Sequence, residues 1–166
     1  MEEKLKFQSL HDSLTGLFNR TYFEEKLNRL QGYLLEQVGI VVCDLDGLKS
    51  VNDTLGHSQG DELLRLAATV IKQCFREEDA VCRIGGDEFA VILPNAGITV
   101  VEQSCRRIHS AVAEYNSKYP EFPLGLSVGF AVGGTIDKDI SDIFKEADNN
   151  MYGKAASQQK YPQIAW

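Results

Sequence analysis

The sequence predicts a single domain in which helices pack against one central β-sheet. Short apolar runs rich in β-branched residues alternate along the chain with longer stretches whose apolar residues follow helical spacing. A Gly-Gly-Asp sequence separates two of the apolar runs, as in a β-hairpin. The chain has 166 residues, of which 43% are hydrophobic, and this is enough for one buried core.

The first quarter of the chain contributes a helix and a strand to this plan. Residues 2–10 are charged and weakly helical, as at the end of a helix or in a linker. Turn-forming residues dominate 11–19, and apolar residues at helical spacing predict a helix over 20–31. The unbroken apolar run over 38–43, rich in β-branched residues, predicts a strand covered on both faces, and this run ends at Asp44.

The rest of the chain supplies seven further elements. They are a short helix over 49–55, a helix over 60–75, strands over 80–84 and 88–93, a helix over 98–115, a strand over 124–132 and a last helix from 140. The Gly85-Gly86 pair favours a tight turn between the two middle strands, because glycine adopts positive φ without steric cost.

Charge and composition exclude several classes of protein. Seventeen basic and 24 acidic residues give a net charge of −7, which argues against non-specific binding to nucleic acid or to an anionic membrane. No apolar run approaches the roughly 20 residues of a membrane-spanning helix, and the charged N-terminus is unlike a signal peptide. The four cysteines form no Cys-x-x-Cys pair, which favours buried, reduced thiols. We therefore expect a cytoplasmic protein with no membrane segment.

Two carboxylates are the first candidates for chemistry. Asp44 ends a buried strand and Asp87 lies in the hairpin turn, so they share one edge of the sheet if the two strands are neighbours. Two carboxylates and a backbone carbonyl such as that of Leu45 form an oxygen site suited to Mg²⁺ or Mn²⁺. Gly85 and Gly86 leave room for a triphosphate against the turn. The alternative is that Gly-Gly-Asp is only a turn and Asp44 only a strand end.

A second cluster has the groups needed to recognise a nucleotide: Lys49, Asn52, Asp53, Gly56, His57, Gly60 and Asp61. Asn52 offers a donor and an acceptor, and Asp61 can accept two hydrogen bonds, so together they could read the edge of a guanine. Lys49 could neutralise a phosphate. Alternatively, Asp61 belongs to the first turn of the helix over 60–75, where a carboxylate is favoured without any ligand.

A charged run, Arg76-Glu77-Glu78-Asp79, follows the same helix. Taken alone, it is a solvated connection in which Arg76 and Asp79 form at most a weak surface ion pair.

The order and spacing of these fragments carry a family resemblance. The chain resembles the GGDEF family of diguanylate cyclases from about residue 10 to residue 151. The matching segments are DSLTGLFNR at 12–20, DLDGLKSVND at 44–53, Gly56-His57, Gly60-Asp61, RIGGDEF at 83–89 and ADNNMY at 147–152.

This resemblance implies a fold and a reaction. The fold is α+β, with a five-stranded, mostly antiparallel sheet flanked by helices, similar to the palm core of nucleotidyl cyclases and polymerases. The reaction condenses two GTP into cyclic di-GMP and releases two pyrophosphates. Each site holds one GTP, so catalysis requires a homodimer. The family is bacterial and usually carries an upstream sensory domain, which implies that 1–10 is the end of a signalling helix, 11–157 the GGDEF domain and 158–166 a tail.

The resemblance also implies roles for single residues. Mg²⁺ or Mn²⁺ is held by Asp44, the Leu45 carbonyl and Asp87, and Asp87 activates the 3′-hydroxyl. Glu88, the fourth residue of the Gly-Gly-Asp-Glu-Phe motif, belongs to the catalytic set in a supporting role that the resemblance does not define. The implied substrate-binding set is Asn52 and Asp61 for guanine, Lys49, Leu48 and Gly47 for phosphate, and His57, Gly85 and Gly86. Arg76 and Asp79 form an Arg-x-x-Asp site at which the product inhibits.

The sequence departs from the family pattern in its last helix. A lysine often follows the tyrosine of that helix by three residues, whereas here Lys154 comes one position early and Ala155 takes its place; Gln159 replaces a later basic residue. The departure keeps a second hypothesis open, that of an inactive GGDEF domain that binds GTP or cyclic di-GMP. A cyclase acting on another nucleotide is the third, and Asp61 argues against it.

Overall fold

The structure is a computed structural model that describes the backbone of residues 2–156 and the side chains as far as Met151. The elements are α1 (Glu2–Leu10), α2 (Arg20–Gln31), β1 (Val38–Leu45), α3 (Leu48–Leu55), α4 (His57–Gln73), β2 (Ala80–Arg83), β3 (Glu88–Pro94), α5 (Ile98–Lys118), β4 (Leu126–Gly133) and α6 (Ile140–Ala156). The predicted order of helices and strands is confirmed.

The strands form one antiparallel sheet in the order β2-β3-β1-β4, so the predicted α+β class is confirmed. The expectation of five strands is wrong for the described residues, which form four. The segment that leads into β4 contains Pro120 and Pro123, which cannot donate to a strand ladder. The Asn116 amide also bonds the N–H and the carbonyl of Leu124, each at 2.8 Å, and so occupies backbone groups that another strand would need.

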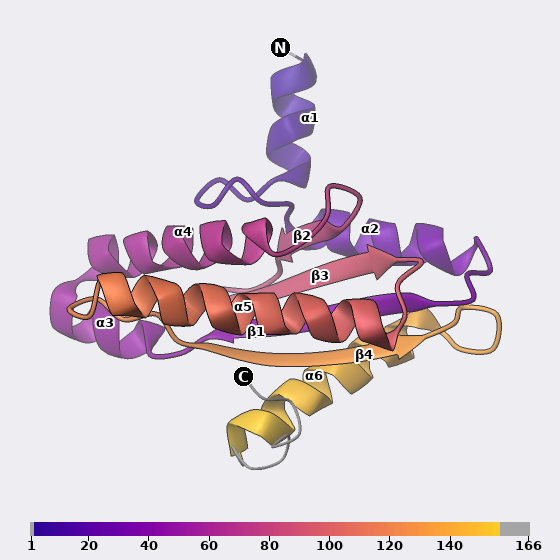
Figure 1. The fold of residues 1–166 in the computed structure, drawn as a ribbon. Helices are drawn as coiled ribbons and strands as arrows, with labels where there is room; N and C mark the ends of the chain where they lie inside the picture. Colours follow the sequence, from indigo (N-terminus) through magenta and orange to yellow (C-terminus); the bar gives the residue numbers. More distant parts are fainter. Residues whose placement is uncertain (1, 157–166) are drawn as a thin grey trace.

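Helices cover both faces of the sheet (Figure 1). On one face α4 and α5 pack with Val41 and Cys43 of β1, and on the other α2 and α6 pack with Ile40 and Val42. All four side chains are 0% exposed, which explains the unbroken apolar run of β1. Helices therefore cover both faces of β1 up to Asp44, the residue near its end that carries the candidate carboxylate.

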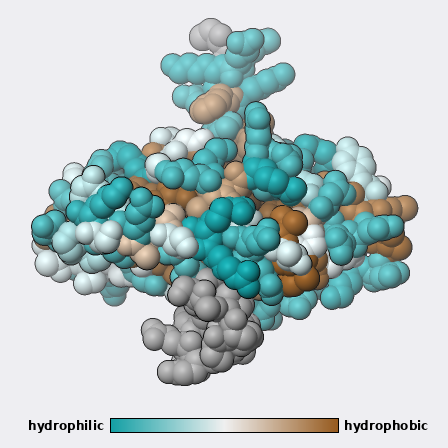
Figure 2. Space-filling view, viewed as in Figure 1, coloured by the Kyte–Doolittle hydropathy of each residue, from teal (hydrophilic) through white to brown (hydrophobic). Residues whose placement is uncertain are grey.

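The helix α1 projects away from this body (Figure 1) and buries none of its residues. Figure 2 shows mostly hydrophilic residues on the face in view, with a smaller hydrophobic group at its right-hand end, where the loops before β1 and after β4 lie in Figure 1.

No helix in the described part of the chain is both long and apolar enough to cross a membrane. All four cysteines are buried and unbridged, as expected, and burial raises the pKa of the Cys82 thiol to about 12.

Candidate functional site

The carboxylates of Asp44 and Asp87 meet at one edge of the sheet. Asp44 lies opposite Glu88 in the β1–β3 ladder, and the Leu45 N–H donates to the Asp87 carbonyl at 2.8 Å. The structure therefore brings Asp44, Leu45, Asp87 and Glu88 together, as the strand-neighbour argument required. β1 extends to Leu45, so Asp44 is part of the strand and not a residue that follows it.

The Asp44 carboxyl is unusual in its surroundings. Burial and then the neighbouring charge and hydrogen bond of Asp87, with smaller contributions from Glu88 and Asp46, raise the pKa of Asp44 to about 7. Its Oδ1 is buried and has no hydrogen-bond partner among the described residues. This half-buried carboxylate is surrounded by like charges, and no described residue gives it a positively charged partner.

A divalent cation fits this need. No group of three His, Cys, Asp or Glu side chains in the described part of the chain is arranged to hold a metal. The expected donor set contains only two such side chains, Asp44 and Asp87, and takes its third oxygen from the backbone of Leu45. The donors present are therefore hard oxygens of the kind that Mg²⁺ prefers, and the Oδ1 of Asp44, which has no hydrogen-bond partner among the described residues, is available to bind such a cation.

Two arginines hold the hairpin turn that carries Asp87. Arg83 donates to the Gly86 carbonyl from Nε at 3.2 Å and from Nη2 at 2.7 Å, and Arg20 donates from Nη1 to the Ile84 carbonyl at 3.2 Å. The other end of Arg83 donates to both carboxylate oxygens of Asp12 at 3.2 Å. The turn is thus fixed by partners far away in the sequence. Arg83 and Asp12 belong to the segments that carry the family resemblance, but nothing in the sequence itself predicts that they pair.

The hairpin turn predicted from Gly85 and Gly86 is confirmed, because β2 and β3 pair as antiparallel neighbours on either side of it. The reason given for glycine does not apply, since neither Gly85 nor Gly86 has a positive φ. Both residues are exposed, and nothing lies within 4 Å of where a Gly86 β-carbon would be. Gly86 therefore leaves open space beside Asp87.

Glu88 faces a second group of charges. Burial and the nearby Asp148 raise the pKa of the Glu88 carboxyl, while Arg20 opposes this shift. Burial also raises the pKa of Asp148, whose Oδ1 is buried without a hydrogen-bond partner among the described residues. Asp148 and Arg20 belong to segments that carry the family resemblance, but neither was assigned a role from the sequence, because only the fold brings α6 and the start of α2 to this edge.

The start of α3 offers backbone donors near the same edge. Gly47 precedes the helix with φ 75° and makes no side-chain cap, so the first N–H groups of α3, from Leu48 and Lys49, have no capping side chain. Such N–H groups and an exposed lysine are favourable partners for phosphate.

Asn52 and Asp61 lie on the packed helices α3 and α4, and neither side chain has a hydrogen-bond partner within the described part of the chain. The helix α4 begins at His57, which is exposed, so Asp61 is its fifth residue. The alternative that Asp61 belongs to the first turn of its helix is therefore wrong, and the helix dipole does not explain it.

Arg76 and Asp79 form a compact pair away from this edge, at the start of β2. The Asp79 side chain is 0% exposed and accepts from the backbone N–H of Arg76 at 2.8 Å, from its Nε at 3.2 Å and from its Nη2 at 2.9 Å. The alternative of a weak surface ion pair is wrong, because one partner is fully buried and the contact is bidentate. Arg107, which was not predicted, donates twice to the Cys74 carbonyl and brings a second guanidinium to this turn.

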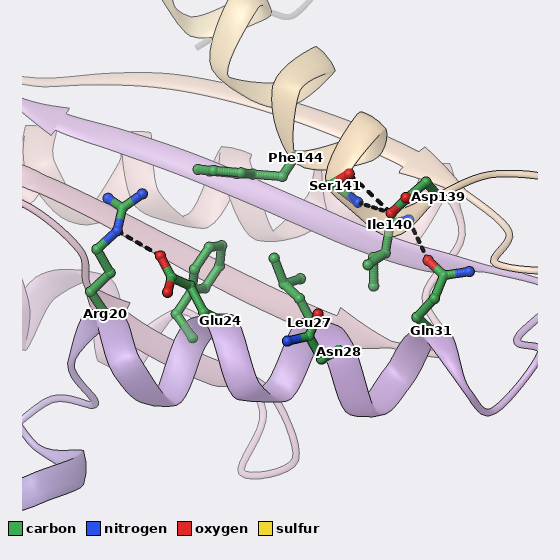
Figure 3. A pocket seen from close by; sticks show the side chains of 10 residues that line it. Arg20, Glu24, Leu27, Asn28, Gln31, Asp139, Ile140, Ser141 and Phe144 are labelled. Atoms are coloured by element: carbon green, nitrogen blue, oxygen red, sulfur yellow. Dashed lines mark hydrogen bonds and ion pairs between the residues drawn. The ribbon is translucent and has the colours of Figure 1, made fainter.

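A pocket of about 420 Å³ lies elsewhere, between α2 and the start of α6 (Figure 3). Phe144 and Leu27 are among its apolar lining residues, and Arg20 and Glu24 form an ion pair at one end. No residue of the predicted site lines this pocket. The altered basic positions of the last helix, Lys154, Ala155 and Gln159, lie outside the described side chains.

Comparison with known proteins assigns the family. The family model described as "Diguanylate cyclase, GGDEF domain" matches residues 9–160, and the chain belongs to this family. It is 32% identical over 156 residues to diguanylate cyclase DgcM of Escherichia coli, covering 92% of this chain and 37% of that protein. It is 33% identical over 162 residues to diguanylate cyclase DgcS of Shewanella oneidensis, covering 93% of this chain and 52% of that protein. The chain thus spans between about a third and a half of these relatives.

Solved structures agree with this assignment. The coiled coil and GGDEF domain of DgcB from Caulobacter crescentus, solved in complex with c-di-GMP, superimposes with a TM-score of 0.80 at 27% identity. The match covers 93% of this chain and 85% of that one.

Proposed function

We propose that this chain is a diguanylate cyclase that condenses two GTP into cyclic di-GMP with release of two pyrophosphates. The observation that carries the proposal is the bare, buried Oδ1 of Asp44 beside Asp87 at the edge of the sheet. Crowded, half-buried carboxylates destabilise the folded chain, and a divalent cation bound between them would offset that cost.

Mg²⁺, typical of the family, or Mn²⁺ would be held by Asp44, the Leu45 carbonyl and Asp87. When bound, the metal stabilises negative charge on the attacking and leaving oxygens of the displacement. Asp87 lies on the turn that Arg83 holds through the Gly86 carbonyl, so its carboxylate is positioned to take the proton of a ribose 3′-hydroxyl. Glu88, kept near Asp148 and Arg20, supports this carboxylate from the next position of the strand.

The remaining residues of the site bind the nucleotide. The side chains of Asn52 and Asp61 have no hydrogen-bond partner among the described residues, and their polar groups match the guanine edge: the carboxylate accepts from N1–H and the 2-amine, and the amide meets N3 or the amine. The N–H groups of Leu48 and Lys49, after Gly47, together with the Lys49 ammonium, match the phosphates. The open space at Gly86, with the exposed Gly85 before it, lets the triphosphate approach the turn, and His57 is the first residue of α4, the helix that carries Asp61.

The geometry of the reaction requires two chains. One site holds one GTP, whereas the product joins two nucleotides through two new bonds, so two protomers must face each other with their turns opposed.

Inhibition by the product is the second part of the proposal. The Arg76 side chain is 38% exposed while Asp79 holds its Nε and Nη2 from inside, and Nη2 also donates to the Pro94 carbonyl at 3.3 Å. A guanidinium can bond a guanine or a phosphate in two parallel contacts, so a ligand bound in this way at Arg76 would use Nη1 and take over a contact that Pro94 or Asp79 makes in its absence. The site lies at the opposite end of β2 from the catalytic turn, so a bound ligand can act on that turn or hold two protomers apart.

Product analysis tests the proposal. The protein at tens of micromolar is incubated with GTP and Mg²⁺, and nucleotides are separated by chromatography. We expect cyclic di-GMP from the wild type and none from Asp87→Ala, which removes an exposed side chain without disturbing the core. A wild type that binds GTP and forms no product would instead support the binding-module hypothesis.

A further inference from the structure

Gly60 lies directly against the amide of Asn52. A β-carbon added at Gly60 would overlap Oδ1 of Asn52, lie 2.9 Å from its Cγ and lie 3.3 Å from Cδ1 of Leu48. These contacts come from the packing of α3 on α4, and Gly60 is buried in this interface. The Asn52 amide therefore occupies the volume that any other residue at position 60 would fill.

The backbone gives no other reason for glycine here. Gly60 is the fourth residue of α4 and its φ is not in the left-handed range. Glycine weakens a helix interior relative to alanine, because its backbone loses more freedom on folding. The helix thus carries a destabilising residue whose structural consequence is the room left for the Asn52 amide.

Packing is what orients that amide. The side chain of Asn52 has no hydrogen-bond partner in the part of the chain that the structure describes, so its contact with Gly60 is the one that limits where the amide can lie. Asp61 follows Gly60 directly, so the same turn of α4 both supports the amide and carries the neighbouring carboxylate. A methyl group at position 60 can be accommodated only if the Asn52 side chain rotates away.

We infer that Gly60 is a positioning residue that sets the Asn52 amide for recognition of the guanine base. This inference rests on the proposed function, because it assigns Gly60 to the nucleotide site described above. It separates two roles within one short segment: Asp61 contacts the base, and Gly60 acts only through Asn52.

A double-mutant cycle tests the inference. GTP turnover is measured for the wild type, Gly60→Ala, Asn52→Ala and the double variant, with Gln59→Ala, an exposed neighbour on the same helix, as control. We expect Gly60→Ala to raise KM for GTP about tenfold or more while kcat stays within about threefold, since only the base contact is lost. In the Asn52→Ala background the same change should raise KM by less than about twofold, and Gln59→Ala should change neither constant.

Thermal unfolding without nucleotide gives a second readout that does not depend on activity. Gly60→Ala should raise the unfolding midpoint in the Asn52→Ala background by more than it does with Asn52 present, because the steric conflict is then absent. Equal shifts in the two backgrounds, or an equal rise of KM in both, would overturn the role of Gly60 and leave the proposed function intact. A wild type that neither binds nor turns over GTP would remove the proposed function, and the inference with it.

Discussion

Replacing Asp44 with asparagine should stabilise the metal-free domain. Its surroundings in the folded protein raise the pKa of Asp44 from the ordinary 3.8 to about 7. Between these two pH values the Asp44 carboxyl keeps its proton in the folded state and has lost it in the unfolded chain. Stability therefore falls as the pH rises from 3.8 to 7, and the full cost is present above pH 7. Asparagine carries no charge at any of these pH values, and its amide can donate a hydrogen bond to Asp87.

The size of the effect follows from the shift. A displacement of about 3 pKa units corresponds to about 4 kcal/mol at most. The Asp44 side chain is partly open to solvent, which screens the neighbouring charges, so we expect about 1–2 kcal/mol. For a domain of this size this amounts to a rise in Tm of roughly 3–6 °C.

Thermal unfolding in EDTA, followed by circular dichroism at pH 8 and pH 5, measures this difference. The gain from Asp44→Asn should be present at pH 8 and much smaller at pH 5, where the wild-type carboxyl is already protonated. Asp53→Asn, an exposed change on α3, serves as the control and should shift Tm very little. Adding Mn²⁺ should stabilise the wild type and not Asp44→Asn. A metal-free Asp44→Asn protein that is less stable than the wild type at pH 8 would refute the reasoning.

Three further predictions concern catalysis and its control. Asp61→Ser should reduce the preference for GTP over ATP at least about tenfold in competition assays, which corresponds to about 1.4 kcal/mol; an unchanged preference would remove Asp61 from the guanine site. Cyclic di-GMP should inhibit the wild type in the micromolar range, or about 8 kcal/mol of binding free energy, and Arg76→Ala should raise the inhibition constant at least about tenfold while sparing kcat. If both proteins are inhibited equally, the Arg76–Asp79 pair is purely structural. Specific activity should rise with protein concentration, because a net charge of −7 opposes association; constant specific activity down to nanomolar monomer is incompatible with a two-chain mechanism.

The sequence was most informative where chemistry and strand ends coincide. A buried run ending at Asp44 and a hairpin turn carrying Asp87 predicted that two carboxylates meet at one edge if the two strands are neighbours, and the antiparallel pairing of β1 with β3 meets that condition. The residue pattern alone identified the four strands that the structure contains, whereas the fifth strand came from the family resemblance and was not found in the described residues.

Contacts between residues far apart in the sequence, and the burial of single side chains, could not be predicted from the sequence. The contact between Arg83 and Asp12 joins residues 71 positions apart, and only the fold brings them together. The burial of Asp79 depends on the surroundings of its turn and not on its charged neighbours in the sequence. In the Gly-Gly turn the sequence predicted the hairpin but not the reason for glycine. Neither glycine has a positive φ, and Gly86 leaves open space beside the turn.

The proposed activity is tested most directly by the stoichiometry of the reaction with GTP and Mg²⁺. Cyclic di-GMP is quantified by mass spectrometry and pyrophosphate by a coupled assay in the same reaction, for the wild type and Asp87→Ala at equal high concentration. The proposed mechanism predicts two pyrophosphates for each cyclic di-GMP in the wild type, and neither product in the variant. Cyclic di-GMP at wild-type rates from Asp87→Ala, or GTP that binds and is recovered unchanged from the wild type, would contradict it.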